Sequence, residues 1–248
     1  EMTSSLVGSE MCIRDRFQDD VFIQSIKNTF FYFILQVPIM LVVALVLACI
    51  LNKKDLRFKG FFRTMIFVPC TTSLVAYSII FRSLFANNGL VNYVLVNIGI
   101  LDKPYNFLTQ PFAAKMVILL GLLWRWTGYN MVFFLSGLQN IEYSVYEAAK
   151  IDGASAIQTF FKITVPLLKP TILLTAIMST NGTLQLFDES VNLTDGGPAN
   201  ASISMSHYIY NLCFKYVPNF GYAAAMSFFI LLLVAVLAVS YTHLRAHE

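Results

Sequence analysis

Five long apolar stretches limit what this chain can fold into. They are residues 26–51, 64–85, 113–137, 171–187 and 221–238. A helix that crosses a lipid bilayer needs about 20 mostly apolar residues. Strands of a membrane barrel alternate in polarity with a period of two, and none of these stretches does so. The whole sequence is 57% hydrophobic and only 12% charged, about half the charged fraction usual in a soluble domain. The pattern predicts an all-α membrane protein, a polytopic helical bundle with five spans present.

The loops between these stretches differ in charge. Loops 52–63 and 138–170 hold eight Lys and Arg residues, whereas the two alternate loops hold only Lys103 and Lys215. Lys and Arg accumulate in the short cytoplasmic loops of plasma-membrane proteins. The sequence therefore predicts a multi-pass protein whose 138–170 loop is cytoplasmic. The first stretch would then begin outside, which is typical of a chain from which a first span is missing.

Both ends of the chain differ from the rest. Residues 1–16 and 239–248 resemble translated sequencing-adapter strings that occur at the ends of unrelated metagenomic proteins. We expect both segments to be non-native. Residues 17–238 are assigned to one transmembrane domain, because no repeat and no Pro- or Gly-rich linker divides them.

Residues that could carry catalysis or bind a metal are scarce. The four cysteines form no C-x-x-C pair, so neither a zinc ribbon nor a disulfide framework is indicated. His207 stands in the 188–220 loop without a second ligand at metal-type spacing, and Asp188 and Glu189 in the same loop are expected to be solvated acids. A net charge of +3 without a basic run interleaved with aromatics argues against nucleic-acid binding. No catalytic residue and no metal site are predicted.

The most informative segment is the loop that comes after the third stretch. Residues 142–150 contain several good helix formers. Asp152 and Gly153 interrupt them, because Gly adopts dihedral angles that other residues avoid and Asp can cap the next helix. The pattern predicts a short helix that ends in a bend.

A second short helix is expected over residues 154–163. Ile157, Phe160 and Phe161 are spaced three and four apart and would form one apolar face. Pro166 is expected to end this helix. Two amphipathic helices held between two spans form a surface that a soluble partner could bind.

The order of residues in this loop resembles a family motif. The residues that carry it are Glu147-Ala148-Ala149, Asp152-Gly153-Ala154, Phe160, Ile163, Pro166 and Pro170. They resemble the EAA motif of binding-protein-dependent ABC transporter permeases, and the Asp-Gly-Ala resembles the carbohydrate branch. Further similarity, over residues 25–238, includes Asn28-Thr29, Leu51-Asn52, Arg63, Pro69, Gly89, Asn92, the run Thr194-Asp195-Gly196-Gly197-Pro198, and Gly221-Tyr222-Ala223. The chain is similar to the larger maltose-type permease subunit and to the glycerol-3-phosphate permease.

The resemblance implies a subunit of a transport complex in the bacterial inner membrane. The loop would dock in a cleft of a cytoplasmic ATPase and couple it to the membrane helices. The residues implied in coupling are Glu147, Ala148, Ala149, Asp152, Gly153, Ala154, Phe160 and Pro166. The implied partners are a homologous permease subunit, an ATPase dimer, an extracytoplasmic substrate-binding protein and the bilayer. ATP and Mg would bind the ATPase, because this chain has no G-x-x-x-x-G-K-[ST] phosphate loop and is not expected to be an enzyme. The alternative is an interfacial helix hairpin without a partner.

Polar residues within the stretches are candidates for the translocation path. Arg125 lies near the middle of the third stretch, where a charge costs at least about 2.5 kcal/mol. One interpretation places Arg125 and Tyr129, which share a helix face, on a sugar pathway. The other buries Arg125 between helices, against a backbone carbonyl or a carboxylate. Asn181 and Gln185, four apart in the fourth stretch, suit the opposite side of the pathway or helix-to-helix hydrogen bonds.

The predicted function is the permease subunit of an ATP-driven sugar importer, and two alternatives stay open. A permease of the same family could carry a non-sugar or phosphorylated solute, such as a glycerol phosphodiester or a polyamine, because Arg125 is a natural partner for an anion. An ion-coupled secondary carrier is disfavoured, because no Asp or Glu lies in any of the five stretches.

Overall fold

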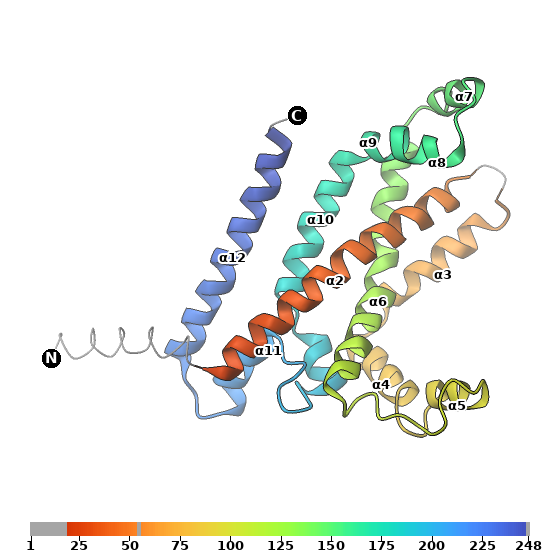
Figure 1. Ribbon diagram of the computed structural model, residues 1–248. Coiled ribbons are helices and arrows are strands. Elements are labelled where there is room, and N and C mark those ends of the chain that lie inside the picture. The colour runs from red at the N-terminus through yellow and green to blue at the C-terminus, as the bar shows by residue number, and fades with distance from the viewer. Residues whose placement is uncertain (1–18, 54–55, 247–248) are drawn as a thin grey trace. The chain divides into compact units, whose positions relative to one another are not determined.

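The computed structural model describes residues 19–53 and 56–246, with side chains as far as residue 240. Within these ranges every regular element is a helix (Figure 1), as the apolar stretches predict. The adapter-like residues 1–16 lie outside the described part of the chain, and the non-native origin of 239–248 stays a prediction.

Five helical segments account for the predicted spans. Three single helices are long and apolar enough to cross a membrane: α2 (Asp20–Leu51), α6 (Pro111–Gln139) and α12 (Phe220–Ala246). Two further candidates are bent pairs: α3 (Lys59–Thr71) with α4 (Leu74–Leu84), and Ala156–Leu167 with α10 (Lys169–Leu184). If each bent pair counts as one span, the described residues hold five, in the predicted order.

The described residues form two compact units. Unit 1 comprises residues 19–35, 73–121 and 181–246, and unit 2 comprises 36–72 and 122–180. The shorter elements are α5 (Leu90–Asn97), α7 (Tyr143–Ile151), α8 (Ala156–Thr159), η2 (Phe160–Thr164), α9 (Val165–Leu167), η3 (Ser190–Thr194), α11 (Met205–Tyr210) and η4 (Asn211–Lys215), where η marks a π-helical turn.

The second predicted span is not one continuous helix. The backbone becomes extended at Thr72 and Ser73, with ψ values of 147° and 135°, and this separates α3 from α4. The Thr72 hydroxyl donates a 2.7 Å hydrogen bond to the Pro69 carbonyl. A Thr hydroxyl that bonds a nearby carbonyl offers the backbone an alternative to the helical pattern. The span predicted over 64–85 is therefore a broken helix, interrupted shortly after Pro69.

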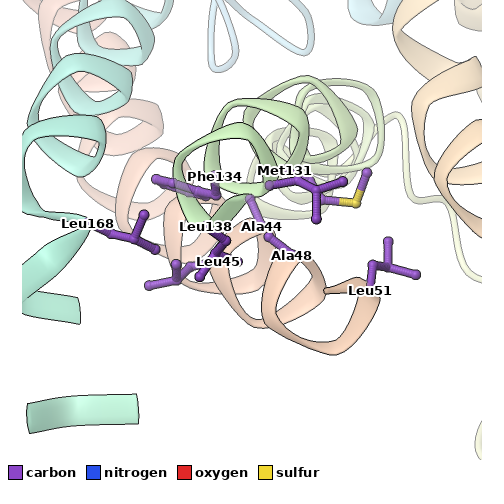
Figure 2. Close-up of a cluster of buried hydrophobic side chains, with 9 residues drawn as sticks. Ala44, Leu45, Ala48, Leu51, Met131, Phe134, Leu138 and Leu168 are labelled. Atoms are coloured by element: carbon purple, nitrogen blue, oxygen red, sulfur yellow. The ribbon is translucent and has the colours of Figure 1, made fainter. Parts of the chain in front are cut away.

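The core of unit 2 lies between α2 and α6. Figure 2 shows Ala44 and Ala48 of α2 beneath the larger side chains of α6, among them Phe134 and Met131, all of which are buried. Leu168 approaches from the segment before α10 and joins the same cluster. Small residues four apart on one helix face let a neighbouring membrane helix approach closely.

A second close approach in unit 2 joins α3 and α6. A methyl group built on Gly128 of α6 would collide with the backbone carbonyl of Ile66 in α3. Only a residue without a side chain fits there, so Gly128 sets the distance between these two helices.

In unit 1, the first turns of α2 bind the segment that leads into α11. Asn28 Nδ2 donates to the carbonyls of Ile203 at 2.9 Å and Asn200 at 3.3 Å. Thr29 Oγ1 accepts from the backbone N–H of Met205 at 3.2 Å. Asn28 and Thr29 are both fully buried, so these polar side chains fix the path of a loop that has no regular structure of its own.

Asp19 links three elements of unit 1. Its Oδ1 accepts from the backbone N–H groups of Val21 at 2.9 Å and Phe22 at 3.2 Å, which caps α2. Its Oδ2 accepts from the hydroxyls of Tyr208 in α11 at 2.6 Å and Tyr222 in α12 at 2.7 Å. Burial alone would raise the pKa of Asp19, but the tyrosine and backbone hydrogen bonds outweigh it and place the pKa below its ordinary value.

Candidate functional site

The EAA-type segment lies entirely in unit 2 and forms the predicted pair of short helices. On α7, Glu147 and Ala148 are exposed, whereas Ala149 is buried. The Glu147 carboxylate therefore stands on an open face of the helix. A partner that contacts this face would meet the charged Glu147 and the small side chain of Ala148.

The bend after α7 is built by backbone geometry. Gly153 has a φ of +75°, in the left-handed region. The N–H of Ala154 donates to the Ala149 carbonyl at 2.9 Å, and the N–H of Gly153 donates to the Lys150 carbonyl at 3.2 Å. These two bonds form a Schellman motif, which ends a helix with a glycine in this position. The bend predicted at Gly153 thus has a defined shape.

The cap of the second helix differs from the prediction. Asp152 ends α7 as its C-cap and does not cap α8. Ser155 caps α8: its hydroxyl accepts from the backbone N–H of Gln158 at 3.3 Å, and the Gln158 side chain accepts from the Ser155 N–H at 2.8 Å. This is a capping box, and the Ser-x-x-Gln spacing in the sequence is its signal.

The second helix also continues further than predicted. The helical path runs on through the π-helical turn η2 and α9, past Pro166, and bends by 70° at Leu168 before α10. Pro166 stands in α9, which directly follows the π-helical turn.

The apolar residues of this segment divide between two environments. Phe160 packs against the core of unit 2, whereas Ile157 and Phe161 are 71% and 65% exposed. Ile151, at the end of α7, is 85% exposed. The single face predicted for Ile157, Phe160 and Phe161 is therefore wrong. Three bulky apolar side chains instead surround the bend in the open, and such a patch is characteristic of a protein interface.

Arg125, the predicted pathway cation, is buried in unit 2. Its Nη1 donates a 2.9 Å hydrogen bond to the carbonyl of Thr72, where α3 has ended, and its guanidinium lies 5.6 Å from the Trp126 ring centre. A carbonyl at the end of a helix lacks its intrahelical partner, and a cation stabilises it. This contact agrees with the second interpretation of Arg125, in which the side chain is buried between helices against a backbone carbonyl. The pathway role of Arg125 stays a prediction.

Tyr129 belongs to a row of aromatic rings along α6. Its ring centre lies 5.9 Å from that of Trp126 and 5.0 Å from that of Phe133, both edge to face. Phe133 is not among the residues singled out from the sequence, although its spacing of four residues from Tyr129 on a helix could have indicated the contact.

Asn130, the residue after Tyr129, connects three helices of unit 2. Its side chain donates to the Trp126 carbonyl at 3.1 Å and to Met40 Sδ of α2 at 3.4 Å. Its Oδ1 accepts from Ser179 Oγ of α10 at 3.2 Å. A buried amide that bonds neighbouring helices stabilises a membrane bundle.

Asn181 and Gln185 meet as their spacing predicts. Gln185 Nε2 donates to Asn181 Oδ1 at 2.7 Å, and both side chains are exposed. They lie in unit 1, whereas Arg125 and Tyr129 lie in unit 2. The placement of the two pairs on opposite sides of one pathway stays a prediction.

The loop at 188–220 is more ordered than its sequence suggests. Glu189 is only 4% exposed, so its prediction as a solvated acid is wrong; it lies just before η3, whose Ser190 is fully buried. His207 is fully buried as well, with Nδ1 2.9 Å from Ser190 Oγ and Nε2 3.7 Å from Asp195 Oδ1. Asp195 Oδ1 in turn accepts a 2.6 Å bond from Lys215 Nζ.

His207 therefore supports the loop from a fully buried position. Burial lowers the pKa of His207 to about 4, with Asp195 opposing the shift and Lys215 adding to it, so the ring is neutral at pH 7. Among the described residues no group of three or more His, Cys, Asp or Glu side chains could hold a metal ion.

Known proteins resemble this chain over most of its length. It is 55% identical over 222 residues to the lactose transport system permease protein LacF of Rhizobium radiobacter, a match that covers 89% of this chain and 74% of that protein. It is 34% identical over 227 residues to the arabinooligosaccharides transport system permease protein AraP of Bacillus subtilis, covering 90% and 71%.

Solved structures share the fold. A bacterial ABC transporter involved in the import of the acidic polysaccharide alginate matches with a TM-score of 0.86 at 23% identity, over 99% of this chain and 89% of that one. A bacterial alginate ABC transporter in complex with an alginate pentasaccharide-bound periplasmic protein matches with a TM-score of 0.83 at 25% identity, over 97% and 87%.

The family model for the inner membrane component of binding-protein-dependent transport systems matches residues 20–247. These residues include α2, α6 and α12 and the whole EAA-type segment. The chain therefore belongs to the family of binding-protein-dependent transport system inner membrane components.

Proposed function

We propose that this chain is the permease subunit of an ATP-driven sugar importer and that its EAA-type segment receives the movement of a cytoplasmic ATPase. The observation that carries the proposal is the segment itself: an exposed Glu147 and an open apolar patch, held around a bend of defined geometry. The surplus of Lys and Arg in this loop favours its cytoplasmic location.

The sugar class is inferred from the relatives. The name of the Rhizobium radiobacter permease includes lactose, and the name of the Bacillus subtilis permease includes arabinooligosaccharides. Because this chain is 55% and 34% identical to these two permeases, we infer that its substrate is lactose or an oligosaccharide.

The proposed partners are those that such an importer needs. The sequence has no phosphate loop, so ATP and Mg would bind a separate ATPase dimer. A homologous permease subunit would complete the membrane domain. An extracytoplasmic binding protein would deliver the sugar, and a related alginate transporter has been seen in complex with a periplasmic protein of this kind.

Coupling requires that the segment moves as one body. The Schellman motif fixes α7 to the bend, the Ser155 capping box fixes the start of α8, and Phe160 anchors the next turn to the core of unit 2. A push on the exposed patch around Ile157 would then be transmitted to α10 through Leu168, which is buried in the same core.

The proposed translocation path includes Arg125, Tyr129, Asn181 and Gln185. The row Trp126–Tyr129–Phe133 offers aromatic edges and faces on which a sugar ring could pack. Asn181 and Gln185 are exposed amides that can bond sugar hydroxyls. The contact of Arg125 with the Thr72 carbonyl gives its guanidinium a structural task as well.

One reconstitution tests the proposal. The chain is expressed with the ATPase and permease genes that neighbour its own, purified, and placed in proteoliposomes with the neighbouring binding protein. ATP hydrolysis is measured with lactose, an arabino-oligosaccharide, a glycerol phosphodiester and a polyamine. We expect stimulation by a sugar, and stimulation by the phosphodiester or the polyamine alone would assign the substrate to another class.

A matched pair of variants tests the coupling step. Glu147→Lys reverses the charge on the open face of α7 and should abolish sugar-stimulated hydrolysis while the chain still inserts in the membrane. Glu142→Lys changes an exposed acid at the N-cap of the same helix and should retain most of the activity. Equal activity in the two variants would contradict the role of Glu147.

A further inference from the structure

A cavity of about 730 Å³ lies in unit 2 between the C-terminal ends of α2 and α6 and the helices α7 and α8. Its lining includes Asn52 and Lys53 just after α2, Tyr146 and Lys150 of α7, and Ile141 and Phe160. Pockets that bind small molecules commonly measure about 300–1,000 Å³. The cavity is therefore large enough for a ligand of the size of a sugar phosphate.

The charge of this cavity has one sign. Lys53, just after α2, and Lys150, on α7, both line it, and no acidic side chain is among the described lining residues. Two lysines on the wall of one cavity, with no acidic side chain among the described lining residues, attract an anion, and phosphate is a common partner for lysine.

Tyr146, one of the lining residues, has a hydroxyl that lies just behind the cavity wall. The Tyr146 hydroxyl oxygen is buried and has no hydrogen-bond partner among the described residues. Leaving a buried polar atom unpaired costs free energy, so a rotation of Tyr146 that brings its hydroxyl into the cavity would let it bond a ligand there. Asn52, Gln139 and Thr159 are further polar residues of the lining.

Part of the lining is apolar. Leu138 belongs to the buried core of unit 2, and Ile141 and Phe160 pack against that core. A cavity lined by both apolar and cationic side chains suits a ligand with two ends, one charged and one apolar or ring-shaped.

We propose that this cavity binds a phosphate ester, with the phosphate between Lys53 and Lys150, the Tyr146 hydroxyl donating to it, and the rest of the ligand against Ile141 and Phe160. A free phosphorylated metabolite and the headgroup of an anionic phospholipid share this chemistry. That a metabolite of the cytoplasm can reach this cavity rests on the cytoplasmic location proposed for the loop. The binding of a phosphate ester rests only on the cavity.

A bound ligand would act on the bend between α7 and α8. Lys150 and Tyr146 belong to α7, Ala154 to the bend, and Ala156 to α8, so all three parts of the EAA-type segment line the cavity. A ligand that also holds Lys53 would tie this segment to the end of α2. The site is thus placed to alter how freely the segment moves, which rests on the proposed coupling role.

The test measures binding to the full chain, without any partner subunit. The chain is reconstituted in nanodiscs of neutral phosphatidylcholine, and binding of glucose 6-phosphate and inorganic phosphate is followed by calorimetry. In a second arm, native mass spectrometry in detergent compares retention of phosphatidylglycerol and phosphatidylcholine. The first arm detects a soluble ligand, and the second detects a lipid.

Three variants make the result specific. The double variant Lys53→Ala/Lys150→Ala should lose at least about tenfold in affinity for whichever phosphate compound binds. Tyr146→Phe, which removes only the hydroxyl, should weaken binding by a smaller factor and leave the fold intact. Lys162→Ala removes an exposed lysine of the same segment that does not line the cavity and should bind as the wild type does.

Each outcome decides the proposal. Soluble phosphate compounds that bind wild type and Lys162→Ala but not the double variant support a metabolite site. Selective retention of phosphatidylglycerol with the same dependence on the lysines supports a lipid site. The proposal is overturned if neither class binds, or if the double variant binds as well as Lys162→Ala does. Because no ATPase or transport is involved, a failed reconstitution of the importer would not alter this result.

Discussion

At the residue scale, Gly153 is held by its backbone angle and not by crowding. Nothing lies within 4 Å of a Cβ built at this position, so a larger side chain would meet no neighbour. The φ of +75° is the constraint, because a residue with a Cβ adopts this region at a cost of about 1–2 kcal/mol.

We therefore predict that Gly153→Ala weakens coupling and that Gly153→Asn does so less, since Asn tolerates left-handed angles. The measurement is sugar-stimulated ATP hydrolysis in the reconstituted complex. Gly182→Ala is the control: Gly182 also has free space around it but lies inside α10, where Ala favours the helix. A Gly153→Ala complex as active as Gly182→Ala would contradict the prediction.

Arg125 gives a second prediction at this scale. Arg125→Met leaves the partly buried Thr72 carbonyl without its cation, and an unsatisfied buried acceptor costs at most about 1–3 kcal/mol. We expect a lower thermal unfolding temperature in detergent, with Arg125→Lys intermediate because one donor remains. If Arg125 also lies on the translocation path, the Arg125→Lys variant should in addition have a changed Michaelis constant for sugar transport. An Arg125→Met protein that unfolds at the wild-type temperature would exclude the structural role.

The sequence could predict that Arg125 needs a partner but not which one. A charge in a membrane stretch always calls for compensation, and both interpretations came from that alone. The partner is a carbonyl at the far end of α3, and no local pattern reports it. Tyr129 and Phe133 differ, because residues four apart on one helix are neighbours whatever the tertiary fold.

At the scale of elements, Asp19 joins the start of α2 to α11 and α12. Its pKa is lowered in the folded chain, so its carboxylate stabilises the fold above the unfolded pKa of about 3.9. This contribution is lost as the pH falls through the lower, folded value.

We predict that Asp19→Asn lowers the unfolding temperature at neutral pH, by the loss of about 1 kcal/mol for each weakened tyrosine bond. The variant should also show less loss of stability than the wild type below about pH 4. Thermal unfolding over a pH series measures both effects. Asp102→Asn, an exposed acid of the same unit, should follow the wild-type curve, and identical pH curves for both variants would refute the Asp19 contribution.

The helices themselves were predictable, but two of their boundaries were not. Apolar length alone located α2, α6 and α12, because the bilayer sets that length. The break at Thr72 is accompanied by a hydroxyl bond to the Pro69 carbonyl, and composition cannot distinguish it from the ordinary kinks of membrane helices. The extent of the second short helix depends on η2, a π-helical turn that lets the chain pass Pro166.

At the scale of the whole molecule, orientation in the membrane is the open prediction. Gln158, on α8, is exposed, and it lies in the loop whose charges favour the cytoplasm. Lys103 is exposed in a loop that the same rule places outside. In a background without native cysteines, Gln158→Cys should react with an impermeant maleimide only after the membrane is opened, and Lys103→Cys in intact cells. The reverse labelling pattern would invert the topology.

The family could be recognised from the sequence because its motif is local. Residues 147–154 are continuous in the sequence and form both the end of α7 and the bend after it. The path for substrate is not local: two of its four predicted residues lie in unit 1 and two in unit 2. A pattern along one helix can place residues on a face, but it carries no information on what lies across from that face.

The bonds that Asn28 makes have a consequence for how the chain is synthesised. The residue it bonds, Ile203, is 175 positions later in the chain, so the ribosome exposes α2 long before its polar partners exist. Until then, the side-chain amide of Asn28 must form hydrogen bonds with water or with another protein at the translocon. Closure of unit 1 is consequently a late event of biogenesis, and a nascent chain halted before residue 200 would present unmet polar groups that quality-control proteases can recognise.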